Sequence, residues 1–338
     1  MADVAWLSIT SYCSDIGLVM SILSNCTLLV LLSRERAKKL GSYKYLIATF
    51  SLTGMFYSAV EWFMRPLIHI YDDNTFIIQR KRFDYSRFVV RILFTTYCGC
   101  YATSFTLFAV HFIYRYLSVC TTNKVKYFEG YRFFFWLLGI FTVATSWAMF
   151  TYSCFPESDR TTSVFREVVT NSYNLNVSET DYVPYTYWMY ENDVKVLNPI
   201  NVMGLMQHLI IMVISFAISF FCGYRTAVFL RQTKVLSDKT KKLQKQLLKA
   251  LVVQTIIPTI FMYIPTGMVF LLPFLEINIE AYGNLTIVAV HLYPGIDPLV
   301  LILVLKDFRK TLSLALRSVF KSTTQRIIVV SGQASSRQ

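Results

Sequence analysis

The sequence predicts an all-α membrane protein, a bundle of seven transmembrane helices with its N-terminus outside and its C-terminus inside. Hydrophobic residues make up 54% of the 338 residues and charged residues only 16%, below the roughly 25% of soluble domains. Seven apolar stretches are long enough to cross about 30 Å of hydrocarbon. The segments between them alternate in charge.

The seven stretches are interpreted as helices because each holds about 20 mostly apolar residues, the length that a transmembrane helix needs. The first, second, third and seventh contain one or two charges, whereas the other three contain none. In chain order, the predicted spans are residues 11–32, 45–64, 89–113, 133–152, 202–223, 250–272 and 285–305.

The connecting segments set the orientation. Those on one side carry 24 basic and 4 acidic residues, and those on the other carry 8 basic and 13 acidic residues. Lys and Arg concentrate in cytoplasmic loops, so the basic side is predicted to be inside. This alternation requires an odd number of spans, which favours seven. It also argues against a nucleic-acid partner, because the net charge of +13 belongs to cytoplasmic loops.

Two segments on the inner side have an amphipathic pattern. Lys241, Lys245 and Lys249 recur at four-residue spacing where the sixth span extends inward, which suits either a partner protein or anionic membrane lipid. Residues 306–320 are predicted to form a helix lying in the membrane interface. Residues 321–338 are expected to be a disordered cytoplasmic tail.

Polar residues deep in a span are costly and tend to be functional. Asn25 and Asp297 lie at nearly the same depth, about 12 Å from the inner face at 1.5 Å per residue, so they could link the first and seventh spans. The alternative is that Asp297 is only capped by backbone that proline has freed. Pro258 and Pro265 are expected to bend the sixth span, either as a hinge or as static kinks.

The inner end of the third span carries His111 and Arg115. Arg115 either contacts a cytoplasmic partner or is a positively charged residue that reaches to the interface. His111 is expected in this inner layer rather than in a ligand site.

The outer half of the bundle holds a second set of candidate residues. Aromatic rings with a few hydrogen-bonding groups suit a small, mostly apolar ligand, although each of these side chains is also compatible with ordinary packing. The set consists of Glu61, Tyr97, Tyr101, His208, Tyr263 and His291. The long aromatic segment 153–201 is expected to form a partly ordered lid.

No catalytic motif of the P-loop, HExxH or GxSxG type occurs, and the four histidines form no metal-ligand pair. We therefore expect neither an enzyme, nor a metal site, nor a cofactor. Two glycosylation sequons, at Asn176 and Asn284, fall on the predicted outer side, and Asn176 is the credible one because Asn284 adjoins the seventh span.

Several stretches together resemble the nematode Str-type seven-transmembrane chemoreceptors. They include GSYKYL (41–46), CGCYATSF (98–105), HFIYRY (111–116), KLQKQLLKALVVQTIIPTIFMYIPTG (242–267) and LYPGIDPLVLILVLKDFRK (292–310). The resemblance implies an olfactory G protein-coupled receptor in the plasma membrane of a sensory cilium. Its partners would be a small volatile or water-soluble odorant and a heterotrimeric G protein.

The chain departs from the rhodopsin pattern in three places. No acid precedes Arg115, Tyr293-Pro-Gly-Ile-Asp-Pro298 replaces NPxxY, and the outer end of the third span lacks the usual cysteine. A Cys13–Cys154 disulfide would be a substitute for the missing bond. A ligand-gated channel or small-solute transporter is the alternative function, but no span carries a continuous polar stripe.

Overall fold

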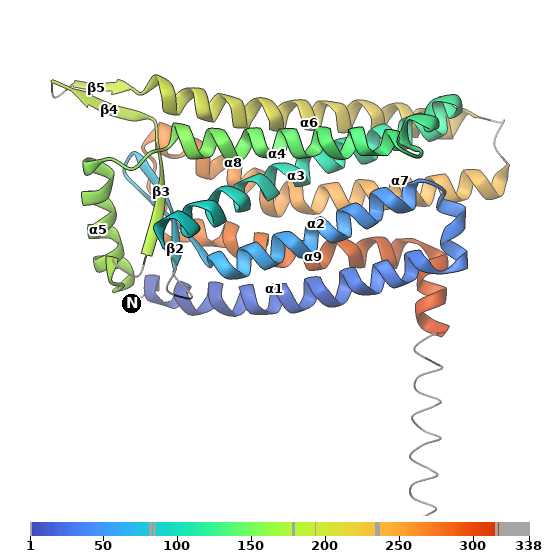
Figure 1. The fold of residues 1–338 in the computed structure, drawn as a ribbon, viewed down its shortest axis with the longest axis horizontal. Coiled ribbons are helices and arrows are strands. Elements are labelled where there is room, and N and C mark those ends of the chain that lie inside the picture. The colour runs from blue at the N-terminus through green and yellow to red at the C-terminus, as the bar shows by residue number, and fades with distance from the viewer. Residues whose placement is uncertain are drawn as a thin grey trace, which may run out of the picture.

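The computed structural model describes residues 2–80, 83, 86–177, 180–192, 194–233, 237–314 and 317. They form a long helical bundle with strands and a short helix, α5, gathered at the end that holds the N-terminus (Figure 1). We name this the outer end, following the charge pattern of the loops. The other end, where the basic segments lie, is the inner end.

Five helices of the described part are long and apolar enough to cross a membrane. They are α1 (Ala2–Ser33), α3 (Arg87–Cys120), α4 (Arg132–Cys154), α6 (Pro199–Gln232) and α9 (Asn284–Val304). The second predicted span falls on α2 (Tyr43–Met64). The sixth falls on an interrupted helix made of α7 (Asp238–Pro258), the π-turn η4 (Thr259–Tyr263) and α8 (Ile264–Leu271). The residue limits of the membrane-embedded parts stay a prediction.

Proline causes the interruption of the sixth span. Pro258 ends α7 and Pro265 stands in the first turn of α8, on either side of the π-turn. A proline has no N–H to donate to the carbonyl four residues earlier, and its ring crowds that carbonyl. The α-helix is therefore interrupted between the two prolines, and both its bending and its movement as a hinge stay predictions.

The outer loops contain strands that the sequence analysis did not predict. β1 (Pro66–Tyr71), β2 (Asn74–Arg80) and β3 (Thr180–Thr186) form an antiparallel sheet in that order. β4 (Trp188–Glu191) and β5 (Val194–Leu197) form a separate hairpin. The membrane bundle itself is helical, as predicted.

The sheet lies between the bundle and α5 (Asp159–Tyr173), so both of its faces are apolar. Successive side chains of a strand point to opposite faces. One face packs on α5 through residues that include Leu67, Phe76 and Tyr182. The other packs on the bundle through residues that include Ile68, Ile77 and Tyr185. The sheet and α5 together are called the lid below.

Local sequence explains where α5 begins and ends. Ser158 and Thr161 form a reciprocal capping box at its N-terminus, an arrangement that satisfies N–H groups left without partners at a helix start. The helix ends at Asn174, which adopts a left-handed conformation (φ 52°) that asparagine tolerates better than most residues.

All seven cysteines are free thiols, so the suggested Cys13–Cys154 disulfide does not form. Cys154 lies at the end of α4 against Gly204 of α6. A Cβ added at Gly204 would lie 2.7 Å from the Cβ of Cys154. α1 runs along the opposite side of the bundle from α4 (Figure 1). The lid is therefore attached by noncovalent contacts.

At the inner end, short 3₁₀ helices follow α1 and α3, at η1 (Glu35–Leu40) and η2 (Thr122–Phe128). Two more, η5 (Pro273–Leu275) and η6 (Ala281–Gly283), lie between α8 and α9 at the outer end, beside the strands. Residues 306–314 are helical and turn sharply away from the direction of α9 (Figure 1). Phe308 in this segment is buried against the inner end of the bundle, and a position of the segment in the membrane interface stays a prediction. Residues 318–338, with the end of that helix and the predicted tail, lie outside the described residues.

Candidate functional site

A small cavity lies beneath the lid, where side chains of α3, α4, α8 and α9 converge. Its volume is about 40 Å³, and a single water needs about 10–15 Å³ of such space. The cavity in this conformation therefore fits a molecule of only a few heavy atoms. Its larger lining side chains are Ile68, Ile77, Tyr97, Tyr101, Trp147, Tyr185 and Phe270.

The cavity wall favours a neutral ligand. Cys98, Thr266 and Thr286 add small polar groups to the apolar lining, and none of the described residues that line it is charged. Burying an unpaired charge in such surroundings is costly. An uncharged molecule with a group that accepts or donates a hydrogen bond matches this wall.

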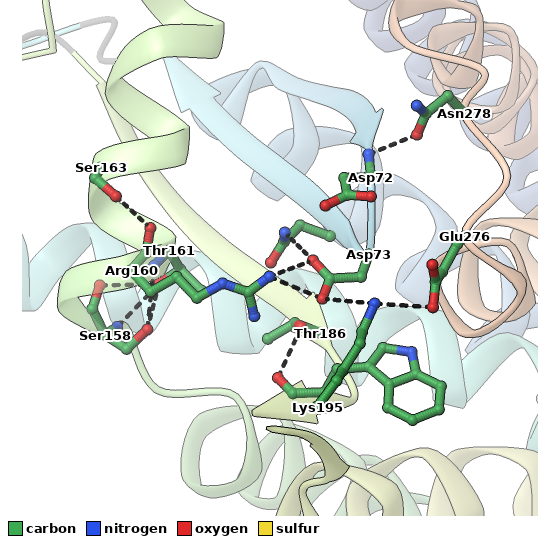
Figure 2. Close-up of polar contacts among 12 residues, drawn as sticks. Asp72, Asp73, Ser158, Arg160, Thr161, Ser163, Thr186, Lys195, Glu276 and Asn278 are labelled. Carbon is green, nitrogen blue, oxygen red and sulfur yellow. Dashed lines mark hydrogen bonds and ion pairs between the residues drawn. The ribbon is translucent and has the colours of Figure 1, made fainter. Parts of the chain in front are cut away.

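At the outer end, acidic and basic side chains join the turn between β1 and β2 to α5, to β5 and to the segment between α8 and α9 (Figure 2). Asp73, in the turn between β1 and β2, is fully buried and accepts two hydrogen bonds from Arg160 of α5, at 3.0 and 2.9 Å. Lys195 of β5 lies 3.4 Å from Asp73 and 2.8 Å from Glu276. Burial opposes the charge on Lys195, but Glu276 and Asp73 outweigh it and raise the pKa of its ammonium group. We call these four residues the outer latch.

We expect Asp73→Asn to loosen the β1–β2 turn from α5 and from β5. The substitution removes the negative charge that Arg160 and Lys195 share, at a cost of about 1–2 kcal/mol, which corresponds to a factor of about 5–30 in the local opening equilibrium of the sheet. Hydrogen exchange of the β1–β3 amides should speed up by that factor.

Asp72→Asn is the matched control, because Asp72 is the neighbouring residue, is exposed and can keep its left-handed conformation as asparagine. Its strand amides should exchange at the wild-type rate. Wild-type exchange in both variants would show that the outer latch does not hold the lid.

Two further contacts attach the sheet to the bundle. Arg80 at the end of β2 donates to the carbonyl of Leu7 and to the hydroxyls of Thr10 and Ser11 on α1. Burial, with a smaller effect of Arg65, lowers the pKa of Arg80 to about 10, so it stays charged at neutral pH. On the other side, buried Asn284 accepts from the N–H of Ile68 at 2.9 Å.

These contacts also bear on the two glycosylation sequons. The Asn284 amide donates to Tyr173 and to the carbonyl of Ala281, and its side chain is fully buried, so it cannot carry a glycan in this fold. Asn176 is exposed at the lid, as a glycosylation site requires.

The structure separates the six predicted ligand residues into three groups. Tyr97 and Tyr101 line the cavity. His208 and Tyr263 lie behind its wall: the His208 ring is 4.1 Å from that of Trp147, and Tyr263 packs 4.0 Å from Phe105. The two remaining residues pair with each other.

Glu61 of α2 and His291 of α9 form this buried pair, with Oε1 3.0 Å from Nδ1. It becomes an ion pair when His291 is protonated. The pair joins two helices beside the cavity and does not line it.

Sequence reasoning missed several residues of the cavity wall. Trp147 stands in the uncharged fourth span, and Phe270 in the sixth, so no polar residue drew attention to either. Tyr185 belongs to the aromatic run of the predicted lid, and its ring lies 5.2 Å from that of Phe270. The aromatic content of that loop was the available signal.

Toward the inner half, Asn25 joins α1 to α9 where proline has freed a backbone carbonyl. Pro298 has no N–H for the carbonyl of Pro294, four residues earlier. The Asn25 amide donates to this carbonyl at 3.0 Å, and also to the carbonyl and hydroxyl of Ser21. Asp297 instead accepts from Gln254 of α7 at 2.7 Å. The predicted link between the first and seventh spans therefore exists, but it runs through Pro294 and not through Asp297.

Comparison with known proteins identifies the family. The profile of the serpentine type 7TM GPCR chemoreceptor Str family matches residues 10–313. Serpentine receptor class r-10 of Caenorhabditis elegans is 40% identical over 92% of both chains, and that of Caenorhabditis briggsae is 40% identical over 92% of this chain and 91% of its own. The G-protein coupled receptor str-33 of C. elegans is 28% identical over 89% of this chain and 88% of its own.

The chain belongs to the Str family of serpentine chemoreceptors. It is therefore a chemosensory G protein-coupled receptor, a multi-pass membrane protein and not an enzyme. The resemblance found in the sequence is confirmed.

In this Str receptor, Arg115 is buried, whereas the sequence predicted that it either contacts a cytoplasmic partner or reaches to the membrane interface. It is 2% exposed and donates to Gln244 of α7 at 2.9 Å. Its guanidinium also stacks 3.5 Å above the ring of Tyr43, whose hydroxyl lies 3.0 Å from Nδ1 of His111. Arg115 and His111 thus hold α2, α3 and α7 together at the inner end.

The three lysines of the receptor's inner helix extension differ in their surroundings. Lys245 and Lys249 are exposed, whereas Lys241 donates to the carbonyl of Thr233 at the end of α6. Lys245 and Lys249 are therefore accessible to an acidic partner surface or to anionic lipid. Lys241 instead links the first turn of α7 to the end of α6 by its hydrogen bond.

Proposed function

We propose that this Str receptor detects small volatile or water-soluble odorants in the cavity beneath the lid and activates a heterotrimeric G protein. The observation that carries the proposal is the small, uncharged cavity lined by Tyr97, Tyr101 and Tyr185. Its size fits an odorant of a few heavy atoms, and its hydroxyl groups fit a carbonyl or hydroxyl on that odorant.

Ligand binding would favour a second arrangement of the bundle, because a ligand shifts an equilibrium by its difference in affinity for two states. Phe270 of the cavity wall belongs to α8, directly above the π-turn. A ligand that moves Phe270 therefore acts on the outer end of the broken sixth span. The inner end of that span is α7, which holds Arg115 through Gln244.

The G protein would bind at the inner end. Exposed Lys245 and Lys249 offer positive charge for it, and release of Arg115 would add more. The proposed location is the plasma membrane of a sensory cilium, with a glycan on Asn176. The lid, with Asn176, would then face the outside medium, where odorants arrive.

The direct experiment is odorant-dependent nucleotide exchange on a purified G protein, with small ketones, alcohols and acids tested in turn. We expect Val290→Phe to abolish the response. Val290 lines the cavity and is 1% exposed, so a phenyl ring there takes up space that the odorant needs. Even one methylene in a tight pocket changes discrimination by about 10–200-fold.

Val288→Phe is the matched control, since Val288 lies on the same helix, is half-buried and does not line the cavity. It should respond as wild type at equal surface expression. An unchanged response of Val290→Phe would place the odorant elsewhere. An odorant response that needs no G protein would instead favour a ligand-gated channel.

A further inference from the structure

Another cavity lies at the outer end of the bundle, where the first turns of α3 meet the end of β2 and the start of β3. Its volume is about 230 Å³, a little below the range of about 300–1,000 Å³ that is usual for drug-sized ligands. Pro156 and Glu157, in the segment between α4 and α5, are exposed and line it. The cavity is therefore reached from the outer side, and we call it the outer cavity.

The outer cavity is separate from the cavity beneath the lid. Ile77 of β2 lines the cavity beneath the lid, whereas Val183, its directly opposite partner on β3, lines the outer cavity. On α3, Phe94 lines the outer cavity and Cys98, one turn further along the helix, lines the other. None of the described residues lines both, so each cavity can take a molecule of its own.

The enclosed part of the outer cavity is apolar. Val90 and Phe94 of α3 and Val183 of β3 line it, and these side chains are 4%, 2% and 9% exposed. Moving the hydrocarbon part of a ligand from water to such a wall is favourable. The interior of the cavity therefore suits a small apolar group.

A positive charge also lines the outer cavity. Arg91 of α3 is half-buried, and its guanidinium lies 4.6 Å from the centre of the Tyr152 ring on α4. It forms no ion pair with any described residue, although two carboxylates line the same cavity. A guanidinium can hold a carboxylate through two parallel hydrogen bonds. Arg91 is therefore accessible to the carboxylate of a bound molecule.

The two carboxylates, of Glu157 and Asp181, come from other elements than Arg91. Glu157 is exposed and makes no ion pair with a described residue. Asp181 is half-buried and lies opposite Gln79 in the β2–β3 pair, two positions from Val183. Residues two apart on a strand share a face, so Asp181 lies on the face of the sheet that packs on the bundle. The outer cavity thus offers positive and negative charge around an apolar interior.

We propose that the outer cavity binds a small zwitterion with an apolar side chain, which is the chemistry of a free aliphatic amino acid. Its carboxylate would pair with Arg91, and its ammonium group would lie toward Glu157 and Asp181. Its side chain would lie against Phe94 and Val183. The receptor would then bind a water-soluble, charged ligand in addition to the neutral odorant. This site does not depend on the odorant site beneath the lid.

The test measures binding of L-leucine to the full-length receptor in lipid nanodiscs by ligand-observed NMR titration. Two analogues keep the branched chain of leucine but lack one charge: 3-methylbutan-1-amine lacks the carboxylate, and 4-methylpentanoate lacks the ammonium group. We expect the amine to bind about tenfold more weakly than leucine, as for the loss of a hydrogen bond to a charged group. The effect for 4-methylpentanoate should be about two- to fivefold, because exposed Glu157 is screened by water.

Two substitutions assign the ends of the ligand. In Arg91→Gln, leucine and 3-methylbutan-1-amine should bind equally, because the carboxylate has lost its partner. In Glu157→Gln, the preference for leucine over 4-methylpentanoate should shrink, while the preference over the amine stays. Arg166→Gln and Glu167→Gln are the matched controls, since both residues are exposed on α5 and lie outside the cavity. They should keep both preferences of the wild type.

Three results would contradict the proposal. If leucine, valine and phenylalanine all fail to bind saturably to the folded receptor, the outer cavity is not a zwitterion site. If 4-methylpentanoate binds as tightly as leucine, Arg91 holds only an anion, such as a lipid phosphate at the outer interface. If Arg91→Gln keeps the preference for leucine over the amine, leucine binds elsewhere. Each readout is binding without signalling, so these results are independent of the odorant assay.

Discussion

Gln244→Leu should raise ligand-independent G protein activation about 10- to 100-fold. Gln244 accepts a hydrogen bond from Arg115, which is 2% exposed. A hydrogen bond to a charged group contributes about 1.5–3 kcal/mol, and every 1.4 kcal/mol is a factor of ten. Leucine removes the acceptor and leaves the guanidinium buried without it. The closed inner end is then less stable relative to any arrangement in which Arg115 reaches solvent.

The measurement is nucleotide exchange on purified G protein without odorant, at equal receptor amounts. Gln246→Leu is the control, because Gln246 lies on the same helix, is half-buried and does not contact Arg115 in the described contacts. Basal exchange at the wild-type level in Gln244→Leu, with normal surface expression, would show that the Arg115–Gln244 contact does not restrain the receptor. Equal increases in both variants would point to a general weakening of α7.

The helical bundle could be predicted because the bilayer imposes a simple rule on the sequence. A spanning helix satisfies its own backbone hydrogen bonds, so length, hydropathy and loop charge suffice to find it. Each predicted span lies on a helix of the structure, including the sixth, where Pro258 and Pro265 flank the break. The proline positions themselves indicated where that helix is interrupted.

The lid was less predictable because its sheet joins distant segments. β2 pairs with β3, so Ile77 lies opposite Val183, more than a hundred positions along the chain. The strands also lack the alternation of apolar and polar residues that identifies a half-exposed sheet, since both faces are covered. The run Pro66-Leu-Ile-His-Ile-Tyr71 therefore resembled a short apolar loop.

Among the site residues, depth could be estimated from sequence but partners could not. Counting residues from the ends of spans placed Asn25 and Asp297 at one level. Whether the two side chains contact each other depends on how each helix is rotated about its own axis, and counting residues does not give that rotation. Arg115 shows the same limit: its position at the inner end of α3 was predicted correctly. Its burial depends on Gln244, 129 positions later.

Asn25→Leu should lower the apparent melting temperature by about 2–12 °C, because it leaves the buried carbonyl of Pro294 without a donor. An unsatisfied buried polar group costs about 1–3 kcal/mol, and in a large domain each kcal/mol shifts the melting temperature by about 2–4 °C. Thr27→Leu is the control, since among the described residues the Thr27 hydroxyl donates only to the carbonyl of Leu23, in its own helix. It should melt within a degree or two of wild type.

Whether Asn25 compensates for the N–H that Pro298 lacks can be tested by restoring that N–H. Pro298→Ala restores a backbone donor four residues after Pro294, the partner that an uninterrupted helix provides. If Asn25 acts by replacing that donor, Asn25→Leu should cost clearly less in the Pro298→Ala background, a coupling that a double-mutant cycle measures directly. An equal cost in both backgrounds would mean that Asn25 stabilises α1 through Ser21 and not the joint with α9. The seventh helix would then keep its conformation at Pro294 and Pro298 without help from the first.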